Sequence, residues 1–145
     1  MPGDGELVQL ASPDGLRARI YIEDNVANLT LVERILDRHS SIELIPAMQA
    51  TIGLELAREH HPDLIVLDLH LPDMPGAEVL QRLKAERATR EVPVVVLTAD
   101  AAEGLEERVR QLGAADYLTK PLDVPRFLHV LADTLARARA SNRNP

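Results

Sequence analysis

The residues best suited to chemistry in this chain stand directly after short apolar runs. They comprise three carboxylates, a threonine and a lysine: Glu23, Asp24, Asp68, Thr98 and Lys120. Three carboxylates in one crevice repel one another, and burial raises their pKa values unless a cation neutralises them. Mg²⁺ is the natural cation for such a set, because it is a hard ion that prefers oxygen ligands and keeps some of its waters.

The same side chains suit the transfer of a phosphoryl group. A carboxylate beside Mg²⁺ can act as a nucleophile and form an aspartyl phosphate. The lysine and the hydroxyl can then bind the phosphoryl oxygens, and this chemistry needs little beyond positioning and charge stabilisation. Lys120 is one of two lysines beside fourteen arginines, and its compact ammonium fits next to a small phosphoryl group. The other lysine, Lys84, is predicted to be an ordinary surface residue.

Five apolar runs, rich in β-branched residues, must position these side chains. The runs are 19–22, 42–45, 64–67, 94–97 and 116–118. Stretches with apolar residues at helical spacing lie between them. The third and fourth runs lack polar alternation, which is typical of central parallel strands. The five strand–helix units predict an open, doubly wound α/β sheet, and such sheets bind ligands outside the carboxyl ends of their strands.

Composition excludes several other classes of protein. A chain of 145 residues is the size of one domain. Its 23 acidic and 16 basic residues give a net charge of −7, which argues against a nucleic-acid-binding face. The absence of cysteine rules out disulfides and thiolate chemistry. No apolar run is long enough to span a membrane, so we expect no membrane insertion.

The predicted domain covers residues 17–138. Residues 1–16 are rich in Gly and Pro and are predicted to be a flexible lead-in. An apolar stripe predicts a final helix, with Asp123 as its cap and Pro125 in its first turn. The stripe consists of Phe127, Leu128, Leu131 and Leu135. Residues 139–145 are polar and are predicted to be a disordered tail.

Four segments resemble the receiver domains of two-component response regulators. They are 20–25 (IYIEDN), 64–72 (LIVLDLHLP), 96–99 (VLTA) and 117–121 (YLTKP). All four occur in the family's order and at family-like separations. The resemblance implies a flavodoxin-like (βα)5 fold with the parallel strand order 2-1-3-4-5.

The resemblance also implies a role for each matching residue at the site. Asp68 accepts a phosphoryl group from a phosphohistidine of a sensor histidine kinase or a histidine phosphotransfer protein. Asp24, Asp68 and the backbone carbonyl of His70 hold Mg²⁺, with Glu23 acting directly or through a water. Lys120 pairs with the phosphoryl oxygens and precedes Pro121 through a cis peptide bond.

Signalling is implied to follow from a population shift that phosphorylation drives. Thr98 moves toward the phosphoryl group, and Tyr117 then turns inward and remodels the face made by the fourth helix, fifth strand and fifth helix. The same face can serve homodimerisation. His70 and Asp100, two residues beyond Asp68 and Thr98, tune the lifetime of the phosphoryl group. The chain would be cytoplasmic and would catalyse only its own phosphorylation and dephosphorylation.

Two departures from the family pattern and several alternatives stay open. Glu23 stands where an aspartate is commoner, and Pro75 precedes Gly76 where an acidic residue is frequent.

A flavodoxin-like carrier of FMN shares the fold, but its phosphate loop would not carry carboxylates after the first strand. A Mg²⁺-dependent phosphatase with an Asp nucleophile would need a second acid where His70 stands. A receiver domain, in turn, can be a stand-alone regulator or part of a hybrid sensor kinase.

Overall fold

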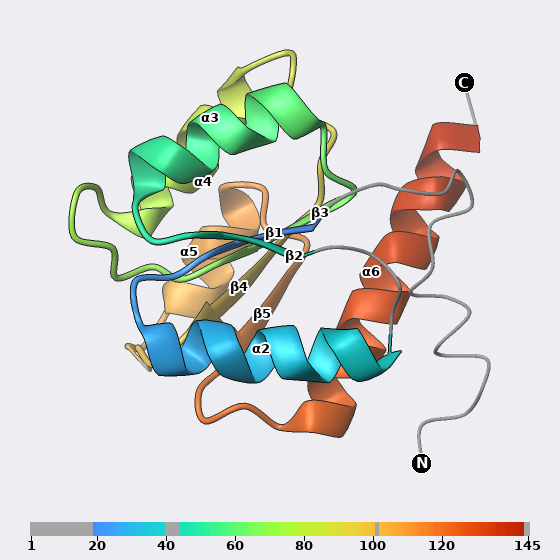
Figure 1. The fold of residues 1–145 in the computed structure, drawn as a ribbon. Helices are drawn as coiled ribbons and strands as arrows, with labels where there is room; N and C mark the ends of the chain where they lie inside the picture. Colours follow the sequence, from blue (N-terminus) through green and yellow to red (C-terminus); the bar gives the residue numbers. More distant parts are fainter. Residues whose placement is uncertain (1–18, 40–43, 101, 144–145) are drawn as a thin grey trace.

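Strands and helices alternate along the chain, as predicted (Figure 1). The computed structural model describes residues 19–39, 44–100 and 102–143, so the predicted lead-in 1–16 lies outside the described residues. The strands are β1 (Arg19–Ile22), β2 (Leu44–Ala47), β3 (Leu64–Leu67), β4 (Val94–Thr98) and β5 (Asp116–Thr119). The helices are α2 (Val26–His39), α3 (Ala50–His60), α4 (Gly76–Ala85), α5 (Leu105–Gln111) and α6 (Val124–Arg143).

The five strands form one parallel sheet in the order β2-β1-β3-β4-β5, which confirms the predicted topology. Ile22 pairs with both Ala47 and Leu67, so β2, β1 and β3 end level with one another. Thr98 likewise pairs with Thr119 at the ends of β4 and β5. The side chains that follow these strands therefore meet at one edge of the sheet.

The helices cover both faces of the sheet, as expected of a doubly wound fold (Figure 1). Helices α2 and α6 pack on one face, where Val66 and Leu97 meet Phe127. Helices α3, α4 and α5 pack on the other face, against Ile65 and Val96. Alternate residues of β3 and β4 thus enter different cores, which is why these strands carry apolar residues without interruption.

Strand β2 is Leu44–Ala47 and so extends two residues past the predicted end at Ile45, whereas residues 42 and 43 of the predicted run lie outside the described residues. It includes Pro46, which a central strand would exclude because proline has no N–H for the ladder. The carbonyl of Ala47 accepts a hydrogen bond from the Glu23 amide at 2.9 Å, so Ala47 faces β1. Neighbouring residues of a strand point their backbone groups in opposite directions, so Pro46 faces the open edge, where it costs no ladder bond.

Helix α6 confirms the predicted stripe and its cap, but it ends later than predicted. The four stripe residues are all buried, and Asp123 Oδ1 accepts a hydrogen bond from the Arg126 amide at 3.2 Å. The helix continues to Arg143, so the predicted disordered tail from residue 139 is wrong for 139–143. The physical reason is the alternating Ala and Arg sequence of 136–140, since both residues favour helix.

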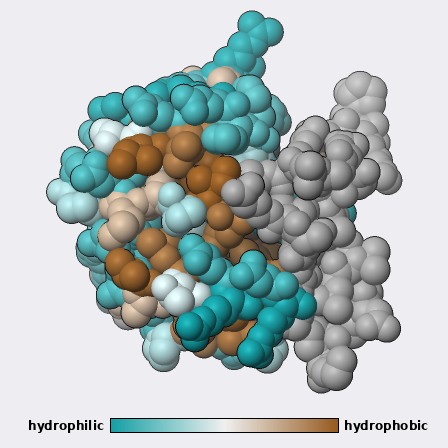
Figure 2. All heavy atoms as spheres, in the orientation of Figure 1, coloured by the Kyte–Doolittle hydropathy of each residue, from teal (hydrophilic) through white to brown (hydrophobic). Residues whose placement is uncertain are grey.

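Some apolar surface remains between α2 and α3, on the side where β2 forms the edge of the sheet (Figure 2). The exposed large apolar side chains belong to α2, to the turn after β2 and to α3: Val26, Leu31, Met48 and Ile52. None of the helices in the described ranges combines the length and apolarity needed to cross a membrane.

Candidate functional site

The three predicted carboxylates meet at the carboxyl edge of the sheet. Glu23 and Asp24 follow β1, and Asp68 follows β3, its neighbour in the sheet. The Asp68 amide donates a hydrogen bond to the carbonyl of Ile22 at 3.0 Å, which fixes the two strand ends together. One carboxylate oxygen from each of the three residues lies within 4.8 Å of the others. The structure therefore brings this part of the predicted site together.

Glu23 is fully buried, and its two carboxylate oxygens have different surroundings. Oε1 accepts hydrogen bonds from the Tyr21 hydroxyl at 3.2 Å and from Asn28 Nδ2 at 2.9 Å, and it also contacts Lys120 Nζ. Oε2 is buried without a hydrogen-bond partner among the described residues. A buried oxygen without a donor is unusual in a folded protein and would be satisfied by a cation. This orphaned oxygen, beside the oxygens of Asp24 and Asp68, fits a hard divalent ion.

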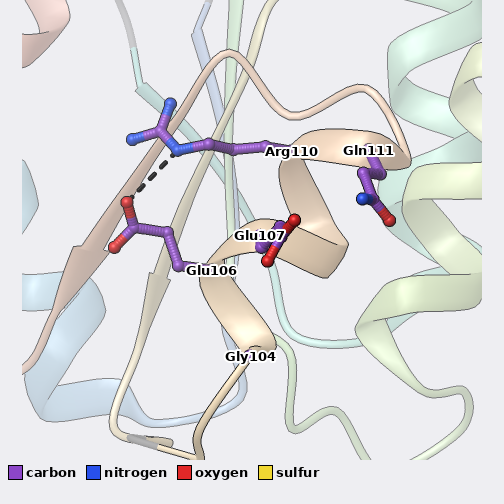
Figure 3. A pocket seen from close by; sticks show the side chains of 5 residues that line it. All are labelled: Gly104, Glu106, Glu107, Arg110 and Gln111. Atoms are coloured by element: carbon purple, nitrogen blue, oxygen red, sulfur yellow. Dashed lines mark hydrogen bonds and ion pairs between the residues drawn. The ribbon is translucent and has the colours of Figure 1, made fainter.

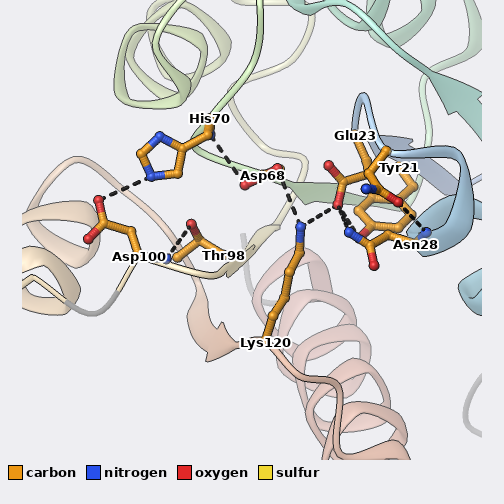
Figure 4. Close-up of polar contacts among 9 residues, drawn as sticks. Tyr21, Glu23, Asn28, Asp68, His70, Thr98, Asp100 and Lys120 are labelled. Atoms are coloured by element: carbon orange, nitrogen blue, oxygen red, sulfur yellow. Dashed lines mark hydrogen bonds and ion pairs between the residues drawn. The ribbon is translucent and has the colours of Figure 1, made fainter.

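Lys120 lies between the buried carboxylates of Glu23 and Asp68 (Figure 4). Its Nζ is 3.4 Å from Asp68 Oδ2. The backbone amide of Lys120 donates to the carbonyl of Thr98 at 2.9 Å, and the Lys120–Pro121 peptide is cis, as the resemblance implied. The ammonium is thus positioned to neutralise the site and to bind the oxygens of an anion placed next to Asp68.

Asp68 is only 4 % exposed, and each of its oxygens has a different partner. Oδ1 accepts a hydrogen bond from the His70 amide at 3.2 Å, whereas Oδ2 faces Lys120.

The negative charge of the site also acts on Tyr21. Burial is the main cause that raises the pKa of Tyr21, and the carboxylates of Glu23 and Asp68 raise it further. Tyr21 therefore stays protonated and serves as a donor to Glu23.

Asp100 connects three of the predicted residues. Its backbone amide donates to Thr98 Oγ1 at 3.2 Å, and its carbonyl accepts from the Tyr117 hydroxyl at 2.7 Å. Its carboxylate oxygen Oδ2 lies 3.1 Å from His70 Nε2. Among the described residues, the hydrogen bond of Thr98 Oγ1 is one that it accepts, so its hydrogen can be donated to an incoming oxygen. Tyr117 is only 8 % exposed, and burial, followed by the charges of Asp100 and Glu106, raises its pKa.

Away from these residues, a hollow of about 630 Å³ lies on α5 and the turn before it (Figure 3). Two of its charged residues pair with one another, since Arg110 Nε is 3.3 Å from Glu106 Oε2. Arg110 also binds Asp116 Oδ1 of β5 at 2.9 Å. This hollow belongs to the predicted interaction face and contains none of the predicted chemical residues.

Sequence reasoning missed the partners that hold Glu23. Asn28 lies in the first turn of α2, and Asn25 Oδ1 caps that turn by accepting from the Asn28 amide at 3.0 Å. Side chains of a helix lean toward its N-terminus, so a polar residue in the first turn after a cap reaches back to the strand end. The sequence signal for this contact is the capping residue Asn25 followed three residues later by Asn28.

Fold and site together define a receiver domain of the response-regulator type. The family of response regulator receiver domains matches residues 20–132, and the chain belongs to this family. The chain is 42% identical over 119 residues to the polar-differentiation response regulator DivK of Brucella ovis, and equally to that of Brucella abortus. These alignments cover 82% of the chain and 96% of each relative.

Solved structures of receiver domains have the same fold. A CheY-like receiver domain protein from Methanospirillum hungatei has a TM-score of 0.80 at 24% identity and covers 88% of this chain and 99% of its own. The Mn²⁺-bound form of the response regulator Rcp1 has a TM-score of 0.68 at 28% identity, over 81% of this chain and 90% of its own.

Proposed function

We propose that this chain is a phosphoacceptor and that Asp68 takes a phosphoryl group from the phosphohistidine of a sensor histidine kinase or a histidine phosphotransfer protein. The observation that carries the proposal is the position of the Asp68 carboxylate. It lies at the carboxyl edge of the sheet, where its Oδ2 is 3.4 Å from Lys120 Nζ and where the carboxylates of Glu23 and Asp24 lie close by. Family membership supports it, because accepting a phosphoryl group is the general function of receiver domains.

The chemistry that we propose is a direct displacement at phosphorus. A carboxylate oxygen of Asp68 forms a bond to phosphorus, the N–P bond of the phosphohistidine breaks, and its electron pair stays on the imidazole nitrogen. Lys120, 3.4 Å from Asp68, binds the phosphoryl oxygens, and Thr98 donates its free hydroxyl hydrogen to one of them. The strand ends hold these groups in place, so little reorganisation is needed at the moment of transfer.

A divalent cation completes this proposal. Glu23, Asp24, Asp68 and the backbone carbonyl of His70 would hold it, and when bound Mg²⁺ would offset the charge of the carboxylates and of the phosphoryl oxygens. The buried, unpartnered Oε2 of Glu23 supports a direct contact for this residue. The extra methylene of glutamate lets the other oxygen, Oε1, reach Asn28 and Lys120 at the same time.

We also propose how phosphorylation is read out. A shift of Thr98 toward a phosphoryl group pulls on Asp100, which is hydrogen-bonded to both Thr98 and Tyr117. Tyr117 would then turn further inward and change the face made by α5, β5 and α6. Partner proteins, or a second copy of the chain, would bind this face. The His70–Asp100 pair lies at the mouth of the site, where it would influence how long the phosphoryl group survives.

Neither alternative function is favoured by the site. An FMN phosphate would meet the carboxylates of Glu23 and Asp24, and a phosphatase would lack its second acid at His70. We propose instead a signalling protein that catalyses only its own phosphorylation and dephosphorylation. We also propose that it acts in the cytoplasm, where a sensor histidine kinase would present its phosphohistidine.

The test is labelling by a small phosphodonor. We expect the chain to acquire one acid-stable, alkali-labile phosphoryl group when it is incubated with acetyl phosphate and Mg²⁺, and to lose this reaction without Mg²⁺. Intact-protein mass spectrometry should show no labelling of Asp68→Asn. The matched control is Asp133→Asn, the same change at an exposed position of α6, which should be labelled normally. Labelling of Asp68→Asn at the wild-type rate would contradict the proposal.

A further inference from the structure

Helix α3 has no cap of its own. Its N-cap residue, Gln49, is extended (φ −136, ψ 150) and makes no side-chain capping bond. Asp73, from the loop between β3 and α4, supplies the cap instead. Asp73 Oδ1 accepts from the Ala50 amide at 2.8 Å, and Oδ2 accepts from the Thr51 amide and hydroxyl, each at 3.0 Å. A carboxylate at a helix N-terminus is favoured by both the free amides and the helix dipole.

The base of the same loop is closed. The Gly76 amide donates to the carbonyl of Leu69 at 2.9 Å, and His70 forms an antiparallel bridge with Pro75. A Cβ on Gly76 would lie 2.4 Å from Leu69 Cα, so only glycine permits this approach. The loop thus leaves and re-enters the sheet edge at fixed points, and Asp73 ties the far part of the loop to α3.

The loop also carries His70, whose backbone carbonyl is one of the ligands of the proposed metal site. Asp24, His70 and Asp73 line one hollow of about 620 Å³ beside that site. Among the described residues, the other side-chain hydrogen bond from residues 69–75 to a distant residue is the contact of the largely exposed His70 imidazole with Asp100. Asp73 is itself exposed, but its three hydrogen bonds, two of them from backbone amides, attach the loop to the start of a helix at more points than the single His70–Asp100 contact does.

We propose that Asp73 is a positioning residue for the metal site, and that by capping α3 it holds the His70 carbonyl against the carboxylates of Asp24 and Asp68. The inference rests on the cation site of the proposed function. Groups that orient metal ligands commonly change metal affinity about tenfold or more when they are removed. Asp73 acts through a short loop, so we expect a change of about threefold to tenfold in affinity.

The test measures binding of Mn²⁺ alone to the unphosphorylated full chain by electron paramagnetic resonance. We expect Asp73→Ala to raise the Kd for Mn²⁺ by about threefold to tenfold. The matched control is Glu86→Gln, which weakens another carboxylate tie to α3, namely the pair with Arg58 near the opposite end of the helix. Glu86→Gln should leave the Kd unchanged.

A second variant separates the loop tie from the helix cap. Adding Gln49→Ser to Asp73→Ala gives α3 a cap of its own, because serine is favoured at an extended N-cap position. We expect this double variant to regain thermal stability while its Kd for Mn²⁺ stays raised. Recovery of the wild-type Kd would overturn the inference, because Asp73 would then act only through helix stability.

The two proposals fail in different ways. If the wild-type chain does not bind Mn²⁺, the proposed cation site is wrong and this inference falls with it. If the wild-type chain binds Mn²⁺ and Asp73→Ala binds it equally well, the cation site stands and only the role of Asp73 is refuted.

Discussion

The two lysines of this chain lie at opposite ends of the sheet and show how the same side chain serves two purposes. Lys120 follows β5 at the carboxyl edge, and its ammonium faces the carboxylates of Glu23 and Asp68. Lys84, on α4, lies near the start of β4, and its ammonium donates to the backbone carbonyls of Arg90 and Val92 at 3.2 and 2.8 Å. One lysine faces ionised groups that can bind a ligand, and the other faces neutral groups that it satisfies.

The prediction that Lys84 is an ordinary surface residue is therefore wrong. Its side chain is partly buried, and its stem lies against Gly113, where a Cβ would come 3.0 Å from Lys84 Cγ. Gly113 has φ +110, a conformation that favours glycine in any case. Burial lowers the pKa of Lys84, and the charge of Glu91 opposes this change only in part. Lys84 stabilises the turn before β4 by donating to its carbonyls, whereas Lys120 contacts the carboxylates of the candidate site.

The largest expected effect separates the two lysines by function. Lys120→Met should slow phosphorylation by acetyl phosphate by about a hundredfold, because it removes a preorganised cation from the phosphoryl oxygens. Lys84→Met should be phosphorylated at the wild-type rate. Initial rates from intact-protein mass spectrometry test both variants. Equal phosphorylation rates for Lys120→Met and Lys84→Met would contradict a role of Lys120 in binding the phosphoryl oxygens.

A second prediction concerns the other partner of Lys120. Glu23→Gln keeps the volume of the side chain but replaces a charged carboxylate by an amide, so the proposed cation loses a charged ligand. We expect the Kd for Mg²⁺ to rise by about tenfold. Isothermal titration calorimetry measures this change. An unchanged Kd would show that Glu23 serves only to hold Lys120 and Asn28.

A smaller effect is expected on stability at the other end of the sheet. Lys84→Met leaves the carbonyls of Arg90 and Val92 without their donor, which should lower the free energy of unfolding by about 1 kcal/mol. Urea denaturation followed by circular dichroism measures this loss. Lys84→Arg is the companion variant, because it keeps a donor on a long stem and should recover part of the stability. If Lys84→Met has the same free energy of unfolding as the wild type, Lys84 is an ordinary surface residue.

The smallest effect concerns acid stability. The amides of Thr51 and Ala50 hold the pKa of Asp73 below its usual 3.8, and Arg58 holds that of Glu86 below its usual 4.5. A lowered carboxyl pKa stabilises the fold above the usual value, and this contribution is lost as the pH falls through the folded pKa.

Between about pH 5 and pH 2, therefore, the melting temperature should fall more steeply for the wild type than for the double variant Asp73→Asn, Glu86→Gln. Thermal melts across this range make the comparison. Parallel curves would show that these two carboxylates do not contribute to acid denaturation.

Much of the fold and most of the site could be predicted because both follow from strand ends. Strands β3 and β4 carry unbroken apolar runs, and level parallel strands bring Asp68 and Thr98 to one edge. The end of β2 is predicted too early because a strand can continue through Pro46 only at the edge of the sheet, and the edge position is a property of the whole sheet. Lys84 and Asp73 could not be assigned because their partners are backbone groups that only the folded chain brings near.

We propose the carboxyl edge of the sheet as a phosphoacceptor site with Asp68 as its nucleophile. Its most direct test is peptide mapping of the chain after phosphorylation by a histidine kinase or acetyl phosphate and reduction with borohydride, which marks the phosphorylated aspartate. We expect a single marked residue, Asp68. Marking of another aspartate, with Asp68 unmodified, would contradict it.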